Sequence, residues 1–107
     1  MREITCEQVK DLKDQYRLID VRTPEEYVGE LGHIPGTELK TLGPELMEFL
    51  KNLNLEEKVV FVCRSGARSG QTTLLSEELG FTQTYNMIGG MLRWNQLGYE
   101  IHKGDSK

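Results

Sequence analysis

Apolar residues occur along the chain in short runs, and few of these runs alternate with polar residues. The clearest run is Val59–Val62, which is apolar throughout and largely β-branched. Such a strand is typical of a sheet that is covered on both faces. Residues 18–21 and 84–87 predict two further strands, and residues 37–39 predict a brief one. The pattern therefore indicates several short strands, of which the one ending before Cys63 is the most buried.

Between these runs the apolar residues recur at helical spacing. A capping-box pattern, in which threonine is followed three residues later by glutamine or glutamate, starts at Thr5 and again at Thr23. After Pro44 the apolar side chains of Leu46, Phe49 and Leu50 share one helical face. Helices are accordingly expected over residues 6–14, from residue 24, from residue 44, and over residues 67–79 and 91–97.

Strands that alternate with helices predict an α/β fold with a mainly parallel central sheet and helices on both faces. The chain has 107 residues and shows no internal repeat, low-complexity tract or linker, so residues 1–107 are expected to form a single domain. Ligands of such folds bind beyond the carboxyl ends of the strands. Cys63 occupies that position after the most buried strand.

Composition excludes several classes of function. The net charge is −4 and no basic stripe offsets it, so nucleic acid is not an expected partner. The longest apolar run, residues 59–63, is far short of the roughly 20 residues of a membrane span. No apolar stretch near Met1 resembles a signal peptide. We therefore expect a cytoplasmic protein, or a cytoplasmic domain of a longer chain, that does not contact a membrane; its oligomeric state is left open.

Cysteine and histidine are sparse. Cys6 and Cys63 lie 57 positions apart, with no C-x-x-C pair, and His33 and His102 are equally isolated. Neither a disulfide framework nor a metal site is expected, and no cofactor is indicated. Cys6 is interpreted as an incidental, partly exposed cysteine. His33 is interpreted as part of a structural turn and not as a catalytic base.

The candidate chemistry lies in residues 63–69, Cys-Arg-Ser-Gly-Ala-Arg-Ser, between a strand and a helix. A thiol at this junction faces the helix N-terminus, where free N–H groups and the helix dipole favour an anion. A loop that curls around the sulfur adds further amides, and Gly66 permits such a turn. Arg68 and Arg64 bring positive charge. All these features predict a lowered pKa for Cys63 and a nucleophilic thiolate. Core packing alone does not explain so polar a loop.

These residues resemble the active loop of the rhodanese family, which often reads Cys-Arg-Ser-Gly-x-Arg-Ser. Three further segments resemble family signatures and follow the family's order along nearly the whole chain. They are residues 18–22 together with Glu26 and Tyr27, residues 32–36, and Gly89-Gly90 together with Trp94. Residues 28–31 make one connection longer than is usual in the family, and Thr37 stands where alanine is common.

The resemblance implies a rhodanese-like fold and a sulfurtransferase of the thiosulfate type. Cys63 would attack the sulfane sulfur of a donor such as thiosulfate, and sulfite would leave. The Cys63 persulfide would then pass its sulfur to a thiophilic acceptor, namely cyanide, a small thiol or a protein cysteine. Residues expected to bind substrate are Arg64, Ser65, Gly66, Ala67, Arg68 and Ser69.

Arg68 is expected to bind the anionic oxygens of the donor or to orient the loop. Asp20 and Arg22 follow a strand that should end on the same side as the loop, and the resemblance implies that they support the site. A local ion pair near Glu26 would account for them equally well.

The same loop is compatible with other functions. Cysteine phosphatases also hold a thiolate among amides, but their loop is one residue longer than the four residues between Cys63 and Arg68. The shorter loop fits one sulfur atom better than a phosphate or an arsenate, so a phosphatase or an arsenate reductase is less favoured. A persulfide carrier that serves a partner protein shares the chemistry and stays open. A regulatory docking module is the further alternative, although such modules often lack the cysteine.

Overall fold

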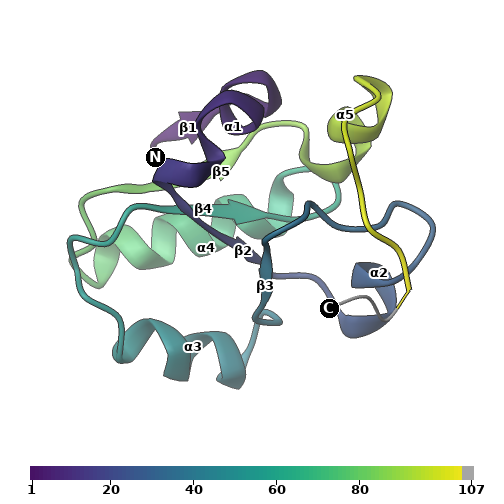
Figure 1. Ribbon diagram of the computed structural model, residues 1–107. Helices are drawn as coiled ribbons and strands as arrows, with labels where there is room; N and C mark the ends of the chain where they lie inside the picture. Colours follow the sequence, from purple (N-terminus) through teal and green to yellow (C-terminus); the bar gives the residue numbers. More distant parts are fainter. Residues whose placement is uncertain (105–107) are drawn as a thin grey trace.

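A computed structural model, which describes residues 1–104, has an α/β fold built on a five-stranded parallel sheet (Figure 1). The strands are β1 (Glu3–Ile4), β2 (Arg17–Asp20), β3 (Glu38–Leu39), β4 (Val59–Val62) and β5 (Thr84–Met87). Their order across the sheet is β1-β5-β4-β2-β3, and every neighbouring pair is parallel. The expected fold class is confirmed, and β1 is the strand that the sequence pattern did not predict.

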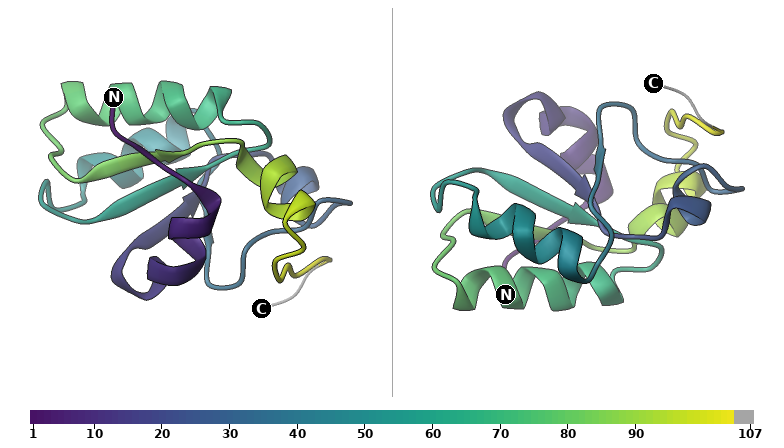
Figure 2. Two further views of the ribbon diagram at one scale, coloured as in Figure 1. Left: turned by 90° about the horizontal axis from the view of Figure 1, so that it is seen from above. Right: turned by 90° about the horizontal axis from the view of Figure 1, so that it is seen from below.

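Helices cover both faces of the sheet (Figure 2), as expected. They are α1 (Cys6–Leu12), which continues as the 3-10 helix η1 (Lys13–Gln15), α2 (Pro24–Tyr27), α3 (Pro44–Lys51), α4 (Ala67–Glu78) and α5 (Gly90–Gln96). The side chains of Thr5 and Thr23 complete the two capping boxes. Both views of Figure 2 place α1 on one face and α3 with α4 on the other.

The core consists of two apolar clusters, one on each side of β4. Val60 and Val62 pack with residues of α1 and α5, whereas Val59 and Phe61 pack with residues of α3. Successive side chains of a strand point to opposite faces, and because both faces of β4 are covered, all four of its side chains are buried and apolar. Cys63 continues the alternation and belongs to the second cluster. The direction of its side chain is thus set by the strand that precedes it.

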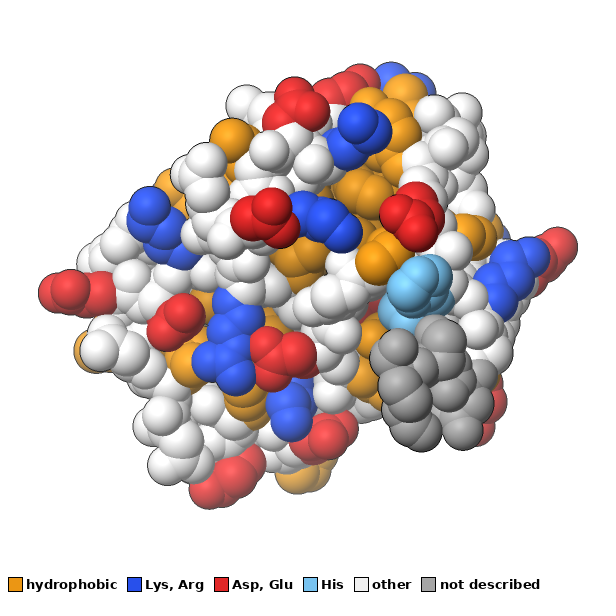
Figure 3. Space-filling model, viewed as in Figure 1, with side chains coloured by type: hydrophobic (Ala, Val, Ile, Leu, Met, Phe, Trp, Pro, Cys, Tyr) orange, Lys and Arg blue, Asp and Glu red, His pale blue; other side chains and the backbone are white. Residues whose placement is uncertain are grey.

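The carboxyl ends of β2 and β4 lie side by side, with Asp20 opposite Val62 in the register. Helices α2 and α5 lie at this end of the sheet (Figure 1). Acidic and basic side chains are interspersed over the face seen in Figure 3. Within residues 1–104, no helix has both the length and the apolar character needed to cross a bilayer.

Candidate functional site

The loop after β4 wraps around the sulfur of Cys63. Gly66 caps α4 with a φ of 107°, in the left-handed region that favours glycine. This turn brings the N–H of Gly66 to 3.0 Å from Cys63 Sγ, to which it donates a hydrogen bond. The curled loop expected from the sequence is therefore present, and it places a backbone donor on the sulfur itself.

Further donors point at the same atom. The hydroxyl of Ser69 lies 3.3 Å from Cys63 Sγ. Burial of Cys63, which is 1% exposed, favours the neutral thiol. The hydroxyl of Ser69 and the amides of Ser69, Gly66 and Ser65 act in the opposite direction and together prevail, so that the pKa of Cys63 is lowered. This direction agrees with the expectation from the sequence, and its cause is a set of neutral donors.

Asn86 of β5 is a member of this cluster that the sequence did not reveal. Its Oδ1 lies 2.5 Å from the Oγ of Ser69, and both residues are buried. A hydroxyl carries one proton, so Ser69 donates either to Asn86 or to Cys63 at any moment. The only signal in the sequence was a polar residue within the predicted strand over residues 84–87. Cys63 and Asn86 therefore share one donor hydroxyl.

Arg68 does not point a free charge at the site. Its two terminal nitrogens each lie 2.8 Å from a carboxylate oxygen of Glu26, in α2. The side-chain hydrogen bonds from Arg68 are the main reason that the pKa of Glu26 is lowered to about 2. The same hydrogen bonds raise the pKa of Arg68. This ion pair fastens the start of α4 to α2, which favours the second of the two expected roles, orientation of the loop.

Asp20 and Arg22 form a buried ion pair. The Nε and Nη2 of Arg22 lie 2.8 and 2.7 Å from the two carboxylate oxygens of Asp20. Arg22 also donates to the backbone carbonyls of Glu26 and Gly32. Within the described residues, neither side chain hydrogen-bonds to the loop around Cys63. The local ion pair is therefore present, and the further hydrogen bonds of Arg22 go to α2 and to Gly32 and not to the loop around Cys63.

The start of α5 packs against the backbone of the active loop. The N–H groups of Met91 and Leu92 donate to the carbonyls of Cys63 and Arg64, at 2.9 and 3.0 Å. A Cβ on Gly90 would lie 2.5 Å from each of these two carbonyl oxygens, so only glycine fits. Gly90 therefore allows α5 to pack closely against the active loop. The two segments are far apart in the sequence, so no local pattern indicates this contact.

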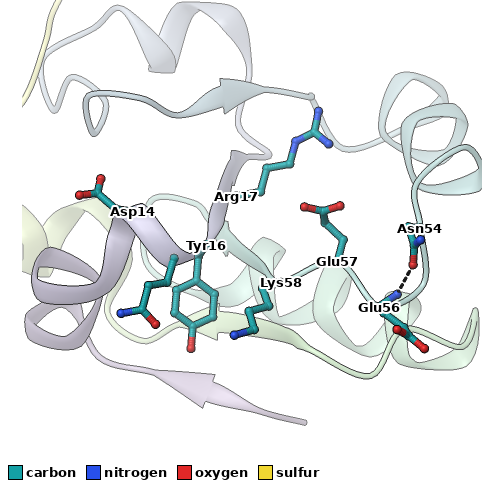
Figure 4. A pocket seen from close by; sticks show the side chains of 8 residues that line it. Asp14, Tyr16, Arg17, Asn54, Glu56, Glu57 and Lys58 are labelled. Atoms are coloured by element: carbon teal, nitrogen blue, oxygen red, sulfur yellow. Dashed lines mark hydrogen bonds between the residues drawn. The ribbon is translucent and has the colours of Figure 1, made fainter.

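A hollow of about 310 Å³ adjoins the loop, and we call it the loop-side hollow. It is lined by Arg22, Glu25, Glu26, Gly29, Glu30, Leu31 and Arg64. The side chain of Arg64 makes no hydrogen bond to any other residue within 1–104. A larger hollow of about 550 Å³ lies at the opposite, amino ends of β2 and β4, where Tyr16, Arg17 and Lys58 surround it (Figure 4). It is remote from Cys63, and no cysteine lines it.

The prediction that Cys6 is partly exposed is wrong. Cys6 is 1% exposed, and its Sγ lies 3.6 and 3.7 Å from the carbonyl oxygens of Ile88 and Gly90. Burial is the main reason that its pKa is raised to about 11. The error arose because the side chain at the first turn of α1 faces the sheet and not the solvent.

His33 has the structural surroundings expected of a turn. Its Nδ1 lies 2.8 Å from the carbonyl oxygen of Tyr27, and its ring stacks on the Tyr27 ring. Its backbone pairs with that of His102. Among residues 1–104, no cluster of histidine, cysteine and carboxylate side chains is arranged to hold a metal ion.

Comparison with known proteins identifies the family. The family model described as "Rhodanese-like domain" matches residues 5–97. The chain belongs to the rhodanese-like domain family. This assignment agrees with the resemblance found in the active loop and in the three other segments.

Several relatives have names that refer to sulfur. "Putative sulfurtransferase YtwF" of Bacillus subtilis is 36% identical over 97 residues, covering 88% of this chain and 90% of that protein. "Putative sulfur carrier protein YrkF" of the same organism is 34% identical over 95 residues, covering 86% of this chain but only 50% of that protein, so the chain spans half the length of this relative. A crystal structure of a rhodanese-like domain protein from Staphylococcus aureus matches with a TM-score of 0.79 at 30% identity, covering 96% of this chain and 100% of that one.

Proposed function

We propose that this protein is a sulfurtransferase that carries sulfur as a persulfide on Cys63. Its family and the names of its relatives support a role in sulfur transfer. The observation that carries the proposal is the set of donors on Cys63 Sγ, with the N–H of Gly66 at 3.0 Å and the hydroxyl of Ser69 at 3.3 Å. These donors stabilise the thiolate that the first step requires.

In the first step the Cys63 thiolate attacks the outer, sulfane sulfur of a donor, for which thiosulfate serves as the assay substrate. A new S–S bond forms to Cys63 while the S–S bond of thiosulfate breaks. The bonding electron pair leaves with sulfite, which is a good leaving group, so no general acid is needed. The charge then resides on the outer sulfur of the persulfide, and the hydroxyl of Ser69 can donate its hydrogen bond to Asn86 Oδ1 instead of to Cys63 Sγ.

In the second step a thiophilic acceptor attacks the outer sulfur of the persulfide. Cyanide takes the sulfur as thiocyanate, and a small thiol or a protein cysteine takes it as a persulfide. The Cys63 thiolate is the leaving group, and the donors that stabilise it in the resting state also favour its departure. The two half-reactions make a ping-pong mechanism.

Two other functions are less well supported. A cysteine phosphatase needs donors arranged around the oxygens of a bound phosphate, whereas here the N–H of Gly66 donates to the sulfur of Cys63 itself. A docking module without activity does not require a cysteine with a lowered pKa. A persulfide carrier that serves a partner protein uses the same site and differs only in its acceptor.

Thiosulfate:cyanide activity tests the proposal. Cys63→Ser is expected to abolish it, because an alcohol at this position is not ionised and forms no persulfide. The matched control is Cys6→Ala, which removes the other buried thiol. It is expected to retain most of the activity, and loss of activity in Cys6→Ala alone would show that the site is misassigned.

A further inference from the structure

The pairing of charges around the active loop bears on the choice of sulfur donor, provided that the proposed function holds. Arg68 is within electrostatic reach of the site, since the Cys63 thiolate contributes to its raised pKa. Its two terminal nitrogens nevertheless bind Glu26, each at 2.8 Å. The bidentate face with which an arginine binds an oxyanion is therefore occupied by a carboxylate of the protein itself.

The loop-side hollow repeats this pattern. Its buried cation, Arg22, is neutralised by Asp20. With Glu26 matched to Arg68, the charges left at the hollow are those of Glu25 and Glu30 against the single charge of Arg64. A dianion that approaches the loop on this side meets a net negative charge and finds one unpaired arginine at most.

We propose that Glu26 determines the donor class by occupying Arg68, so that the site favours a thiol hydropersulfide over the thiosulfate dianion. Thiosulfate carries two negative charges, and a cation with free donors would strengthen the binding of its oxygens. A hydropersulfide carries no anionic oxygens next to its reactive sulfur. It can therefore deliver its sulfur to Cys63 without help from Arg68.

The reaction with this donor balances without an added oxidant or reductant. The Cys63 thiolate attacks the terminal sulfur of R–S–SH and forms the Cys63 S–S bond. The S–S bond of the donor breaks, and its electron pair leaves with R–S⁻. The proton stays on the transferred sulfur and is lost to water when the persulfide ionises.

The variant Glu26→Gln tests this role directly. Glutamine still accepts the capping hydrogen bond from the N–H of Thr23, so α2 keeps its cap while Arg68 loses its ionic partner. The ratio of the kcat/KM for thiosulfate to the kcat/KM for cysteine hydropersulfide is expected to rise about tenfold, because only thiosulfate uses the freed arginine. A change in loop orientation would alter the kcat/KM for both donors, and the ratio cancels it.

A matched control is available one residue away. Glu25 lies in the same helix and lines the same hollow, but within the described residues it pairs with no cation. Glu25→Gln removes the same charge and frees no arginine. The thiosulfate-to-hydropersulfide ratio of kcat/KM is therefore expected to stay within about twofold of the wild-type ratio, because salt and water screen the effect of a single surface charge.

The unmodified protein provides a second test that does not depend on the folding of a variant. Two donors of similar size, cysteamine hydropersulfide and 3-mercaptopropionate hydropersulfide, carry opposite charges. The cationic donor is expected to load Cys63 faster at low salt, and the difference should shrink as salt is added. Faster loading by the anionic donor would overturn the inference.

The outcomes separate this inference from the proposed function. If Cys63 becomes loaded but Glu26→Gln leaves the thiosulfate-to-hydropersulfide ratio unchanged, the inference about Glu26 is wrong and the proposed function stands. If neither donor places sulfur on Cys63 in any of these proteins, the proposed function fails and the inference fails with it.

Discussion

Replacing Ser69 by alanine removes the hydroxyl that lies 3.3 Å from Cys63 Sγ. A hydrogen bond to a charged group contributes about 1.5 to 3 kcal/mol. Sulfur is a weak acceptor and the hydroxyl is shared with Asn86, so the lower end, about 1.5 kcal/mol, applies to the thiolate. Ser69→Ala should therefore reduce the thiolate fraction about tenfold at any pH well below the midpoint of ionisation.

The rate of alkylation of Cys63 by iodoacetamide, followed on its own peptide across a pH series, measures this effect. The rate profile of Ser69→Ala should be displaced towards higher pH, because the pKa of Cys63 rises when one of its donors is lost. Ser76→Ala is a matched control, since Ser76 is also buried in α4 and its hydroxyl also bonds to a residue of β5, Thr84. An unchanged profile in Ser69→Ala, or an equal displacement in Ser76→Ala, would refute the reasoning.

Three further predictions concern the groups that support the loop. Gly90→Ala should lower the free energy of unfolding in urea by about 1–3 kcal/mol or more, because Gly90 has a φ of 58° and an added Cβ would lie 2.5 Å from two loop carbonyl oxygens. A stability equal to that of the wild type would contradict the close packing of α5 against the loop. Asp20→Ala leaves Arg22 buried without its partner and should lower the free energy of unfolding by about 3–5 kcal/mol. Glu38→Ala, which breaks an exposed pair with Arg17, should lower it by about 1 kcal/mol or less, and equal losses in the two variants would argue against a buried charge. The pKa of Glu26 is lowered from 4.5 to about 2, so its ionised form stabilises the fold above pH 4.5, and this contribution is lost as the pH falls towards 2. In an acid titration, Glu26→Gln should lose less stability than the wild type between pH 4.5 and 2. A curve parallel to that of the wild type would argue against the pairing with Arg68.

Much of the fold could be predicted from the sequence because local rules determine it. β4 is a continuous apolar run, and the capping boxes at Thr5 and Thr23 mark where two helices begin. β1 escaped detection because its two residues are too few to show a period, and its pairing with β5 joins opposite ends of the chain.

The candidate site could be predicted only where its residues are adjacent in sequence. The loop around Cys63 is continuous, so its curl and its donors followed from the motif and from the helix after it. The Arg68–Glu26 ion pair joins residues 42 positions apart, and the charge of either residue alone does not reveal its partner. Asn86 reaches the loop from a neighbouring strand, which only the order of strands in the sheet brings close.

The central claim is that Cys63 carries the transferred sulfur, and the intact mass of the protein tests it most directly. After incubation with thiosulfate and removal of excess donor, the mass should increase by that of one sulfur atom, and peptide mapping should locate the gain on Cys63. Subsequent addition of cyanide should return the mass to its starting value with release of thiocyanate. No added sulfur with thiosulfate or with a hydropersulfide, or a gain located on Cys6, would contradict the account.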